Sequence, residues 1–186
     1  MLSDIARFKI KFDNRFEKAN RVLNKLFFSL DGTDFPINEP VPFSSKWNSH
    51  KFKGAALRYE IGLCLRTSNI VWAFGGVPAG EYPDLELARI ALIDRLEPGE
   101  LVVADNGYHD RIFFVYDRKG VMTPRDTMIR KYLARHESVN SRIRVFKVLR
   151  DKYAGDLSFH PTIFRAVVNI VQLQIETGEP LADVSL

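Results

Sequence analysis

Two apolar segments joined by a short turn constrain the fold of this chain most strongly. Residues 56–66 alternate between apolar and polar side chains, the pattern of a β-strand with one buried face. Turn-forming residues follow at 67–69, and a second apolar run returns over 70–74. This arrangement predicts an antiparallel hairpin. An earlier apolar run over 26–30 supplies a third strand, so we expect three antiparallel strands.

The chain then changes from strand to helical patterns. Apolar residues recur at helical spacing, and Pro and Gly mark the breaks. Helices are predicted over 1–23, 85–96, 126–151 and 159–174, and further strands over 101–104 and 112–116. A strand that follows a helix can pair in parallel with an earlier strand. The sequence therefore predicts an α/β fold with a mixed sheet flanked by helices.

Two of the predicted strands end on an acidic residue. Asp31 closes the strand over 26–30, and Asp105 closes the strand over 101–104. A carboxylate held rigidly at the end of a buried strand suits a metal ligand. The same residues also suit plain turns, because Asp-Gly and Asn-Gly are strong turn signals. These two stretches by themselves leave both interpretations open.

A segment rich in Pro, Ser, Asn and Lys separates the first predicted strand from the hairpin. Within residues 34–54, Lys46, Lys51 and Lys53 alternate with the aromatic residues Trp47 and Phe52. Basic and aromatic side chains together suit backbone phosphates and unstacked bases. A solvated loop with two aromatic residues fixed to the core explains the same composition.

Length and composition restrict the classes of protein that remain. The chain of 186 residues is 46% hydrophobic, which is enough for one domain with its own core. It contains no apolar run of about 18 residues, so we expect no membrane-spanning segment. Cys64 is the single cysteine, which excludes an internal disulfide and favours a reducing compartment. The net charge of +4 permits a nucleic-acid partner without requiring one.

Four short motifs follow one another along the chain: Asp-Gly-Thr at 31–33, Gly-Val-Pro-Ala-Gly-Glu-Tyr-Pro-Asp-Leu within 75–85, Ala-Asp-Asn-Gly-Tyr at 104–108 and Arg-His-Glu-Ser-Val-Asn at 135–140. In this order they resemble the DDE endonuclease domain of Harbinger-type transposases, which are relatives of the bacterial IS5 elements. The resemblance covers roughly residues 25–175. It implies a ribonuclease H-like fold, in which carboxylates on the first strand, the fourth strand and a later helix converge.

The resemblance also implies the chemistry of the site. Asp31, Asp105 and Glu137 would bind two Mg²⁺ or Mn²⁺ ions, and the reaction would cut and join DNA strands. Two such ions can stabilise both the attacking and the leaving oxygen of a phosphodiester. Oxygen ligands are the ones that these hard cations prefer.

Further residues are candidates because of their positions near the triad. Asp84 matches an acidic position common in the family, and it serves either as a helix N-cap or as an accessory site residue. Arg135, His136 and Asn140 lie near Glu137 and are candidate DNA contacts, as are the three lysines of the 34–54 segment. His136 is alternatively a partly exposed helix residue. Tyr108 follows Asp105 closely and is expected to line the site, whereas His50 and His160 are read as surface or capping residues.

The predicted organisation is one endonuclease domain over 25–178, an N-terminal helical extension over 1–24 and a tail over 179–186. The resemblance implies DNA ends and target DNA as partners, a homo-oligomer when active, and a separate DNA-binding protein. It implies a nuclear location in a eukaryote and a cytoplasmic one otherwise. Two alternatives remain: an inactive, domesticated descendant that binds DNA or protein, and a different ribonuclease H-like nuclease.

Overall fold

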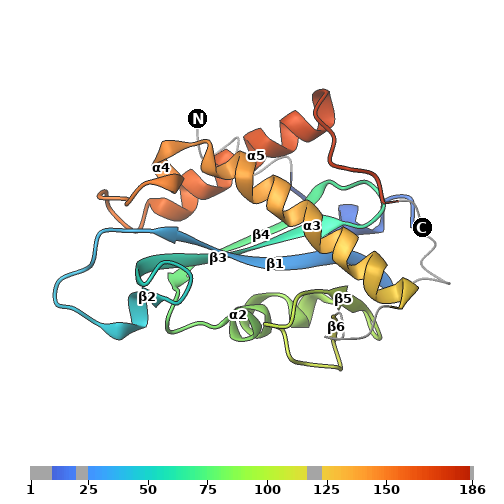
Figure 1. The fold of residues 1–186 in the computed structure, drawn as a ribbon, viewed down its shortest axis with the longest axis horizontal. Coiled ribbons are helices and arrows are strands. Elements are labelled where there is room, and N and C mark those ends of the chain that lie inside the picture. Colours follow the sequence, from blue (N-terminus) through green and yellow to red (C-terminus); the bar gives the residue numbers. More distant parts are fainter. Residues whose placement is uncertain (1–9, 20–24, 117–122, 185–186) are drawn as a thin grey trace.

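A mixed sheet of six strands lies between two layers of helices (Figure 1). The computed structural model describes residues 10–19, 25–116 and 123–184. The main strand order is β4–β3–β1–β5–β6, and the short β2 pairs with the start of β3. The predicted α/β class with a mixed sheet and flanking helices is thereby confirmed.

The antiparallel part of the sheet contains β1 (Leu26–Pro36), β2 (Asn48–Ser49), β3 (Gly54–Cys64) and β4 (Ile70–Pro78). β3 pairs with β1 on one side and with β4 on the other, both antiparallel. The predicted hairpin and its neighbouring first strand are therefore confirmed. The short 3₁₀ helix η2 (Ser45–Trp47) precedes β2.

β1 and β4 are longer than the sequence predicts. Gly32 pairs with Glu60 of β3 and Thr33 pairs with Tyr59, so Asp31 lies in the middle of β1 rather than at its end. The turn interpretation of Asp-Gly is wrong here, because pairing with β3 keeps the chain extended. In β4 the predicted end at 75–76 is a register shift, and the strand continues to Pro78. Gly75 has φ 133°, a conformation that favours glycine.

The parallel part of the sheet contains β5 (Leu101–Val103) and β6 (Phe114–Val115). β5 runs parallel to β1, and β6 runs parallel to β5. The Asn-Gly sequence after Asp105 therefore does not connect a hairpin. β6 is shorter than the predicted strand over 112–116, and residues 117–122 lie outside the described part of the chain.

Helices cover both faces of the sheet. One face carries α3 (Pro124–Arg144), α4 (Lys147–Arg150) and α5 (His160–Thr177), and the other carries α2 (Asp84–Ala91), η3 (Ile93–Arg95) and η1 (Phe12–Phe16). The predicted helix over 126–151 is two helices, because the chain leaves helical geometry at Phe146. α3 also begins earlier than predicted, behind a capping box formed by Thr123 and Asp126.

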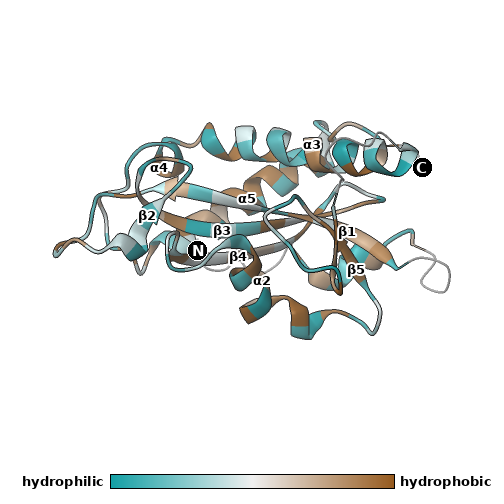
Figure 2. Cartoon of the chain, turned by 60° about the horizontal axis from the view of Figure 1, so that its bottom comes forward, coloured by the Kyte–Doolittle hydropathy of each residue, from teal (hydrophilic) through white to brown (hydrophobic). Residues whose placement is uncertain are grey.

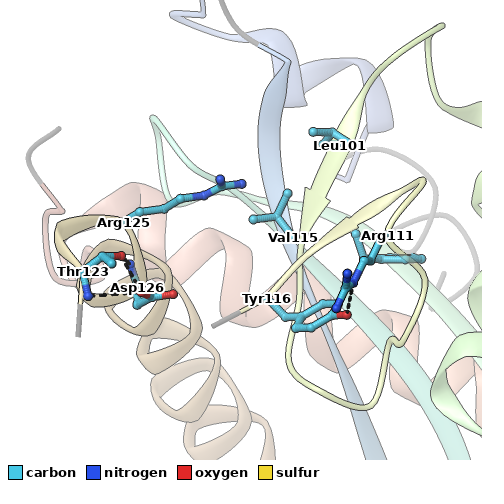
Figure 3. A pocket seen from close by; sticks show the side chains of 8 residues that line it. Leu101, Arg111, Val115, Tyr116, Thr123, Arg125 and Asp126 are labelled. Atoms are coloured by element: carbon cyan, nitrogen blue, oxygen red, sulfur yellow. Dashed lines mark hydrogen bonds between the residues drawn. The ribbon is translucent and has the colours of Figure 1, made fainter. Parts of the chain in front are cut away.

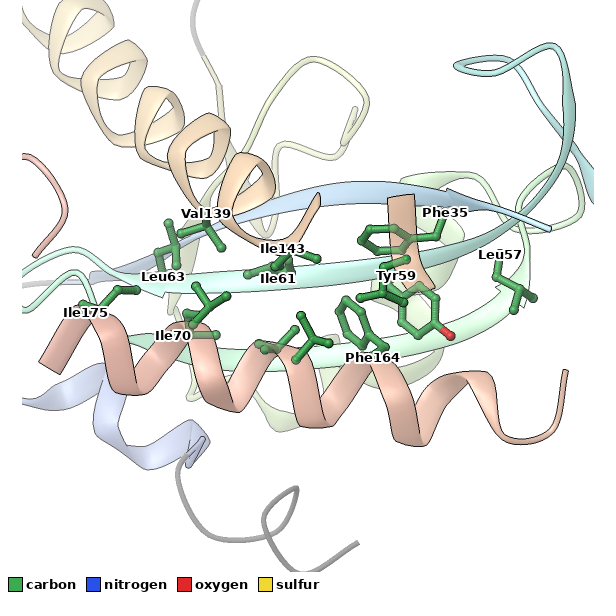
Figure 4. Close-up of a cluster of buried hydrophobic side chains, with 14 of the residues drawn as sticks. Phe35, Leu57, Tyr59, Ile61, Leu63, Ile70, Val139, Ile143, Phe164 and Ile175 are labelled. Carbon is green, nitrogen blue, oxygen red and sulfur yellow. The ribbon is translucent and has the colours of Figure 1, made fainter. Parts of the chain in front are cut away.

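The two largest apolar cores lie on opposite faces of the sheet, and a smaller third core packs α3 on β5 and β6. One lies between the sheet and the α3–α5 layer, where Phe35 and Tyr59 pack with Phe164 (Figure 4). The other lies between the sheet and α2, where Phe28 packs with Trp72 and Leu92. α2 and α3 each contain both apolar and polar residues, as expected for helices with one buried and one exposed face (Figure 2).

Both ends of the described chain pack on these cores. The predicted helix over 1–23 lies partly outside the described residues, and its described part contains η1. Phe12 contacts Phe28 edge-to-face, and the buried Arg15 forms an ion pair with Glu100 at 2.8 Å. At the other end Leu181 is buried in the first core. No helix in the described ranges is long and apolar enough to cross a membrane.

Candidate active site

Asp31 and Asp105 are brought together by the parallel pairing of β1 with β5. Ser29 of β1 is in register with Val103 of β5, so two residues further along each chain the two carboxylates lie at the same level. The two carboxylates also interact electrostatically, because the negative charge of Asp105 raises the pKa of Asp31. This pairing brings together two of the three acids of the expected triad.

Asp31 is the more buried of these two acids. Burial raises its pKa from 3.8 to about 6, and the charges of Asp105 and Asp84 act in the same direction. The charge of Lys51 and a 3.2 Å hydrogen bond from Asn140 Nδ2 act against this rise. Asp31 is therefore a desolvated carboxylate whose repulsion by other acids is only partly compensated.

Asp84 joins these acids instead of capping a helix. Pro83 occupies the N-cap position of α2, and no side chain caps this end. A Cβ on Gly32 would overlap Asp84 Oδ1, and a Cβ on Gly107 would lie 3.2 Å from Asp84 Oδ2. The Asp84 carboxylate thus lies against the backbone next to both Asp31 and Asp105. The N-cap prediction is wrong, and the accessory site role remains.

A buried ion-pair network holds Asp84 in this place. Arg58 donates to both carboxylate oxygens of Asp34, at 2.8 and 2.9 Å, and its Nε lies 3.4 Å from Asp84 Oδ1. Ser49 Oγ donates to Asp34 at 2.6 Å, and Arg58 also donates to the carbonyl of Tyr82 at 3.0 Å. Arg58 therefore connects β1, β3 and the segment that leads into α2.

A second buried acid lies next to the Asp105 loop. Glu60 accepts hydrogen bonds from Tyr108 Oη at 3.2 Å and from Trp72 Nε1 at 3.4 Å. Burial raises the pKa of Glu60 to about 8, so this side chain is largely protonated at pH 7. Tyr108 is fully buried. Its hydrogen bond to Glu60 holds the loop after Asp105 against the core. The prediction that Tyr108 lines the site is not retained.

Three polar pairs join α3 to β1 on the face of the sheet opposite α2. They are His136 with Ser29 at 2.9 Å, Asn140 with Asp31 at 3.2 Å, and Arg144 with Thr33 at 3.3 Å. Alternate residues of the strand thus meet every fourth residue of the helix. Since one helical turn rises nearly as far as two strand residues, the spacings match over three pairs.

Glu137, the third acid of the expected triad, lies on this helix but outside the row of pairs. It is exposed, and it makes no hydrogen bond or ion pair with any residue in the described ranges. Within 10–19, 25–116 and 123–184, no three His, Cys, Asp or Glu side chains form a group that can hold a metal ion. Asp31, Asp84 and Asp105 are close enough for their charges to interact, without forming such a group, and Glu137 lies one helical turn before Asn140.

The donor atoms at this place nevertheless fit a hard divalent cation. All of them are oxygen atoms of carboxylates or of an amide, the ligands that Mg²⁺ and Mn²⁺ take in proteins. Asn140 Oδ1 is inaccessible and has no hydrogen-bond partner in the described structure, whereas the equally inaccessible Asp84 Oδ1 has the charge of Arg58 Nε at 3.4 Å. Inaccessible polar atoms of this kind are costly unless something binds them.

The predicted nucleic-acid contacts divide into two groups. Lys46, Lys51 and Lys53 are exposed on the segment before β3, where they can meet a phosphate backbone. Arg135 is buried and donates to the carbonyl of Leu65 at 3.4 Å, and His136 is buried against β1. Burial also lowers the pKa of His136 to about 3, so it is neutral. The prediction that these two residues touch DNA is not retained.

His50 and His160 are predicted to be surface or capping residues, but only His50 is exposed. His160 is fully buried, and its Nδ1 lies 2.6 Å from Tyr59 Oη. That prediction is wrong because α5 packs its first turn directly on β3.

A pocket of about 520 Å³ lies away from the acids, between β6 and the start of α3 (Figure 3). Arg111, which donates to Tyr116 Oη at 3.4 Å, and Arg125 lie on its walls. Asp126 of the α3 capping box lines it, whereas Asp31, Asp84, Asp105 and Glu137 do not. We assign no function to this pocket.

Arg58, Asp34 and Glu60 are the residues that sequence reasoning missed. In the alternating pattern of β3, Arg58 and Glu60 occupy the positions expected to face solvent. The available signal was the helix predicted after the hairpin. A helix on each side of the sheet buries both faces of its central strand, so polar residues there must be paired.

No protein-family model matches this chain, and neither the curated proteins nor the solved structures give a significant match.

Proposed function

We propose that this chain is a metal-dependent DNA endonuclease and strand-transfer domain of the DDE transposase type. The observation that carries the proposal is the position of Asp31 and Asp105, each two residues beyond the in-register residues Ser29 and Val103 of two parallel strands, with the Asp84 carboxylate and the inaccessible Asn140 Oδ1 beside them. A site built from desolvated carboxylate and amide oxygens suits a divalent cation and an anionic substrate.

A ribonuclease H-like fold is part of this proposal. Its support is the strand order β4–β3–β1–β5–β6, in which three strands are antiparallel and β5 and β6 run parallel to β1. α2 precedes β5, and α3 follows β6. In this arrangement Asp31 lies on β1, Asp105 follows β5, and Glu137 lies on α3.

In the proposed site, Asp31, Asp105 and Glu137 would hold two Mg²⁺ or Mn²⁺ ions. Bound there, such ions stabilise the charge that develops on the attacking and leaving oxygens. Glu137 is exposed and has no partner among the described residues, so its side chain can turn toward the site. Asn140 holds the Asp31 carboxylate in place, and Arg58 holds Asp84 next to both aspartates.

The proposed reaction has two steps. Water attacks a phosphorus atom of the DNA backbone, the bond to the 3′-oxygen breaks, and that oxygen takes up a proton to leave a free 3′-hydroxyl. This hydroxyl then attacks a phosphorus atom of the target strand, forms a new ester bond and releases the target's own 3′-hydroxyl. The exposed lysines of the segment before β3 would bind the DNA backbone.

The same resemblance suggests the setting in which the domain acts. We propose that it works as a homo-oligomer that holds two DNA ends, with a separate protein supplying sequence-specific DNA binding. In a eukaryote this places the chain in the nucleus, and otherwise in the cytoplasm.

Nicking of supercoiled plasmid with Mg²⁺ or Mn²⁺ tests the proposal. We expect metal-dependent nicking by the wild type, and its loss in Asp31→Asn and Asp105→Asn. Asp94→Asn is the matched control, because Asp94 is exposed on η3. Plasmid binding without nicking, at saturating metal, would contradict the nuclease and favour the inactive, DNA-binding descendant.

A further inference from the structure

Lys51 reaches the acidic site from the segment between β2 and β3. Its Nζ donates a 2.5 Å hydrogen bond to the carbonyl of Gly32, the residue after Asp31. Lys46 lies in η2, before β2, with its Nζ 5.2 Å from the centre of the Trp47 ring. The three lysines of this segment therefore do not share one role.

The backbone of Lys51 is fixed by the network that also holds Asp84. Lys51 N donates to Ser49 Oγ at 3.1 Å, and Ser49 Oγ donates to Asp34 at 2.6 Å. Asp34 is in turn paired with Arg58. The start of the Lys51 side chain is thus held in place, while its end is an ammonium group on a flexible four-carbon stem.

The ammonium group acts on the carboxylates without pairing with any of them. Among the charges that surround Asp31, Lys51 has the largest effect, and it lowers the pKa of that carboxyl group. It also lowers the pKa of Asp84. No ion pair joins Lys51 to an acid in the described part of the chain, so its charge is near the site without occupying it.

We propose that Lys51 is a tethered cation that partly neutralises the acidic site and moves to the scissile phosphate once a divalent ion is bound. This rests on the proposed function, since it assigns a role at the same site. A divalent ion between the aspartates removes their net attraction for the ammonium group and repels it. The incoming phosphate then supplies the opposite charge at a distance that the stem can reach.

Replacing Lys51 by Gln should change metal binding and catalysis in opposite directions. Without DNA, loss of a nearby positive charge should strengthen Mn²⁺ binding about fivefold, the order of magnitude expected when a unit charge close to a divalent cation in water is removed. Nicking at saturating Mn²⁺ should fall at least about tenfold, because a charge-assisted contact to the phosphate is lost. A residue with a merely structural role would weaken both.

The experiment compares wild type with Lys51→Gln, Lys51→Arg and Lys152→Gln. Mn²⁺ affinity is measured by calorimetry, nicking on supercoiled plasmid, and folding by thermal unfolding. Measurements at pH 8 keep Asp31 ionised even though the loss of Lys51 raises its pKa. Lys152→Gln is the matched control, because Lys152 is an exposed lysine between α4 and α5 with no role at the site, and Lys51→Arg should retain most of both properties.

The outcomes separate this inference from the function on which it rests. Tighter Mn²⁺ binding with slower nicking in Lys51→Gln supports it. Unchanged or weaker Mn²⁺ binding, or nicking at the wild-type rate, would overturn the role of Lys51 and leave the metal centre standing. Failure of the wild type itself to bind Mn²⁺ would overturn the proposed function, and this inference with it.

Discussion

The face of the sheet that meets α5 and the face that meets α2 are both buried, but by different kinds of side chain. Toward α5, β3 presents Tyr59, Ile61 and Leu63, which pack in an apolar core. Toward α2, the alternate residues of the same strand include Arg58 and Glu60, both almost inaccessible. One strand thus contributes apolar packing on one side and paired charges on the other.

This difference shows how the site is positioned. Burying charge is costly unless every group is paired, so the α2 face is held in one arrangement by its hydrogen bonds. That arrangement carries Asp84 to the backbone of Gly32, where no side chain blocks its approach. Asp31 approaches the same place from the other face, where Asn140 holds it. Asp84 and Asp31 therefore approach the same part of β1 from opposite faces of the sheet.

The largest effect should come from breaking the charged network. Arg58→Ala leaves Asp34 buried without its counter-charge, and we expect a loss of about 3–5 kcal/mol in the free energy of unfolding. Urea denaturation measures it. Arg89→Ala, which removes an exposed ion pair with Glu86, is the control and should leave stability nearly unchanged. Equal effects of the two variants would show that the α2 face does not depend on its buried pair.

Glu60 should make the stability of the protein depend on pH. Its pKa is raised from 4.5 to about 8, so its contribution is fully present below about pH 4.5 and is lost as the pH rises toward 8. The loss should be on the order of 3 kcal/mol. Thermal unfolding between pH 5 and 8 should show a steeper decline for wild type than for Glu60→Gln. Parallel curves would mean that Glu60 is ionised in the folded protein.

Asp31→Asn should stabilise the protein while it abolishes nicking. The pKa of Asp31 is raised from 3.8 to about 6, so its carboxylate lowers stability increasingly between these values and by a constant amount above pH 6. We expect a gain on the order of 1–3 kcal/mol at pH 7.5 without metal, measured by urea denaturation. The gain should vanish near pH 3. A destabilised variant at pH 7.5 would contradict the excess of negative charge at this site.

The smallest effect should come from the polar row on the opposite face. Asn140→Ala removes one hydrogen bond to Asp31 and should cost about 1 kcal/mol. Its effect on Mn²⁺ affinity, measured by calorimetry, should be larger than that of Ser138→Ala, an exposed position on the same helix. If both variants bind Mn²⁺ alike, Asn140 has no part in the metal centre.

The order of the main strands and helices can be predicted from the sequence, because their hydrophobic patterns and turn signals are strong and local. The β3–β4 hairpin and the helix start marked by Thr123 and Pro124 depend on neighbouring residues alone. Asp31-Gly32 misleads because its local preference for a turn is overridden by pairing with β3. The burial of Arg135 depends on contacts with Leu65 and Ser68, which are distant along the chain and leave no trace in its periodicity.

The candidate site was predictable to the extent that it follows from strand order. Asp31 and Asp105 could be expected to meet, because Asp31 lies in β1, Asp105 follows β5 closely, and these two strands are parallel neighbours. Asp84 was recognised as a candidate, but its approach to Gly32 depends on Arg58, whose partners lie on two other elements.

The most direct test is a crystal structure of the protein grown with Mn²⁺, with anomalous differences measured to locate the ion. We expect a peak between the carboxylates of Asp31 and Asp105, with the side chain of Glu137 turned toward it. No peak at that position under saturating Mn²⁺, or occupied peaks only elsewhere on the molecule, would contradict the proposed metal centre.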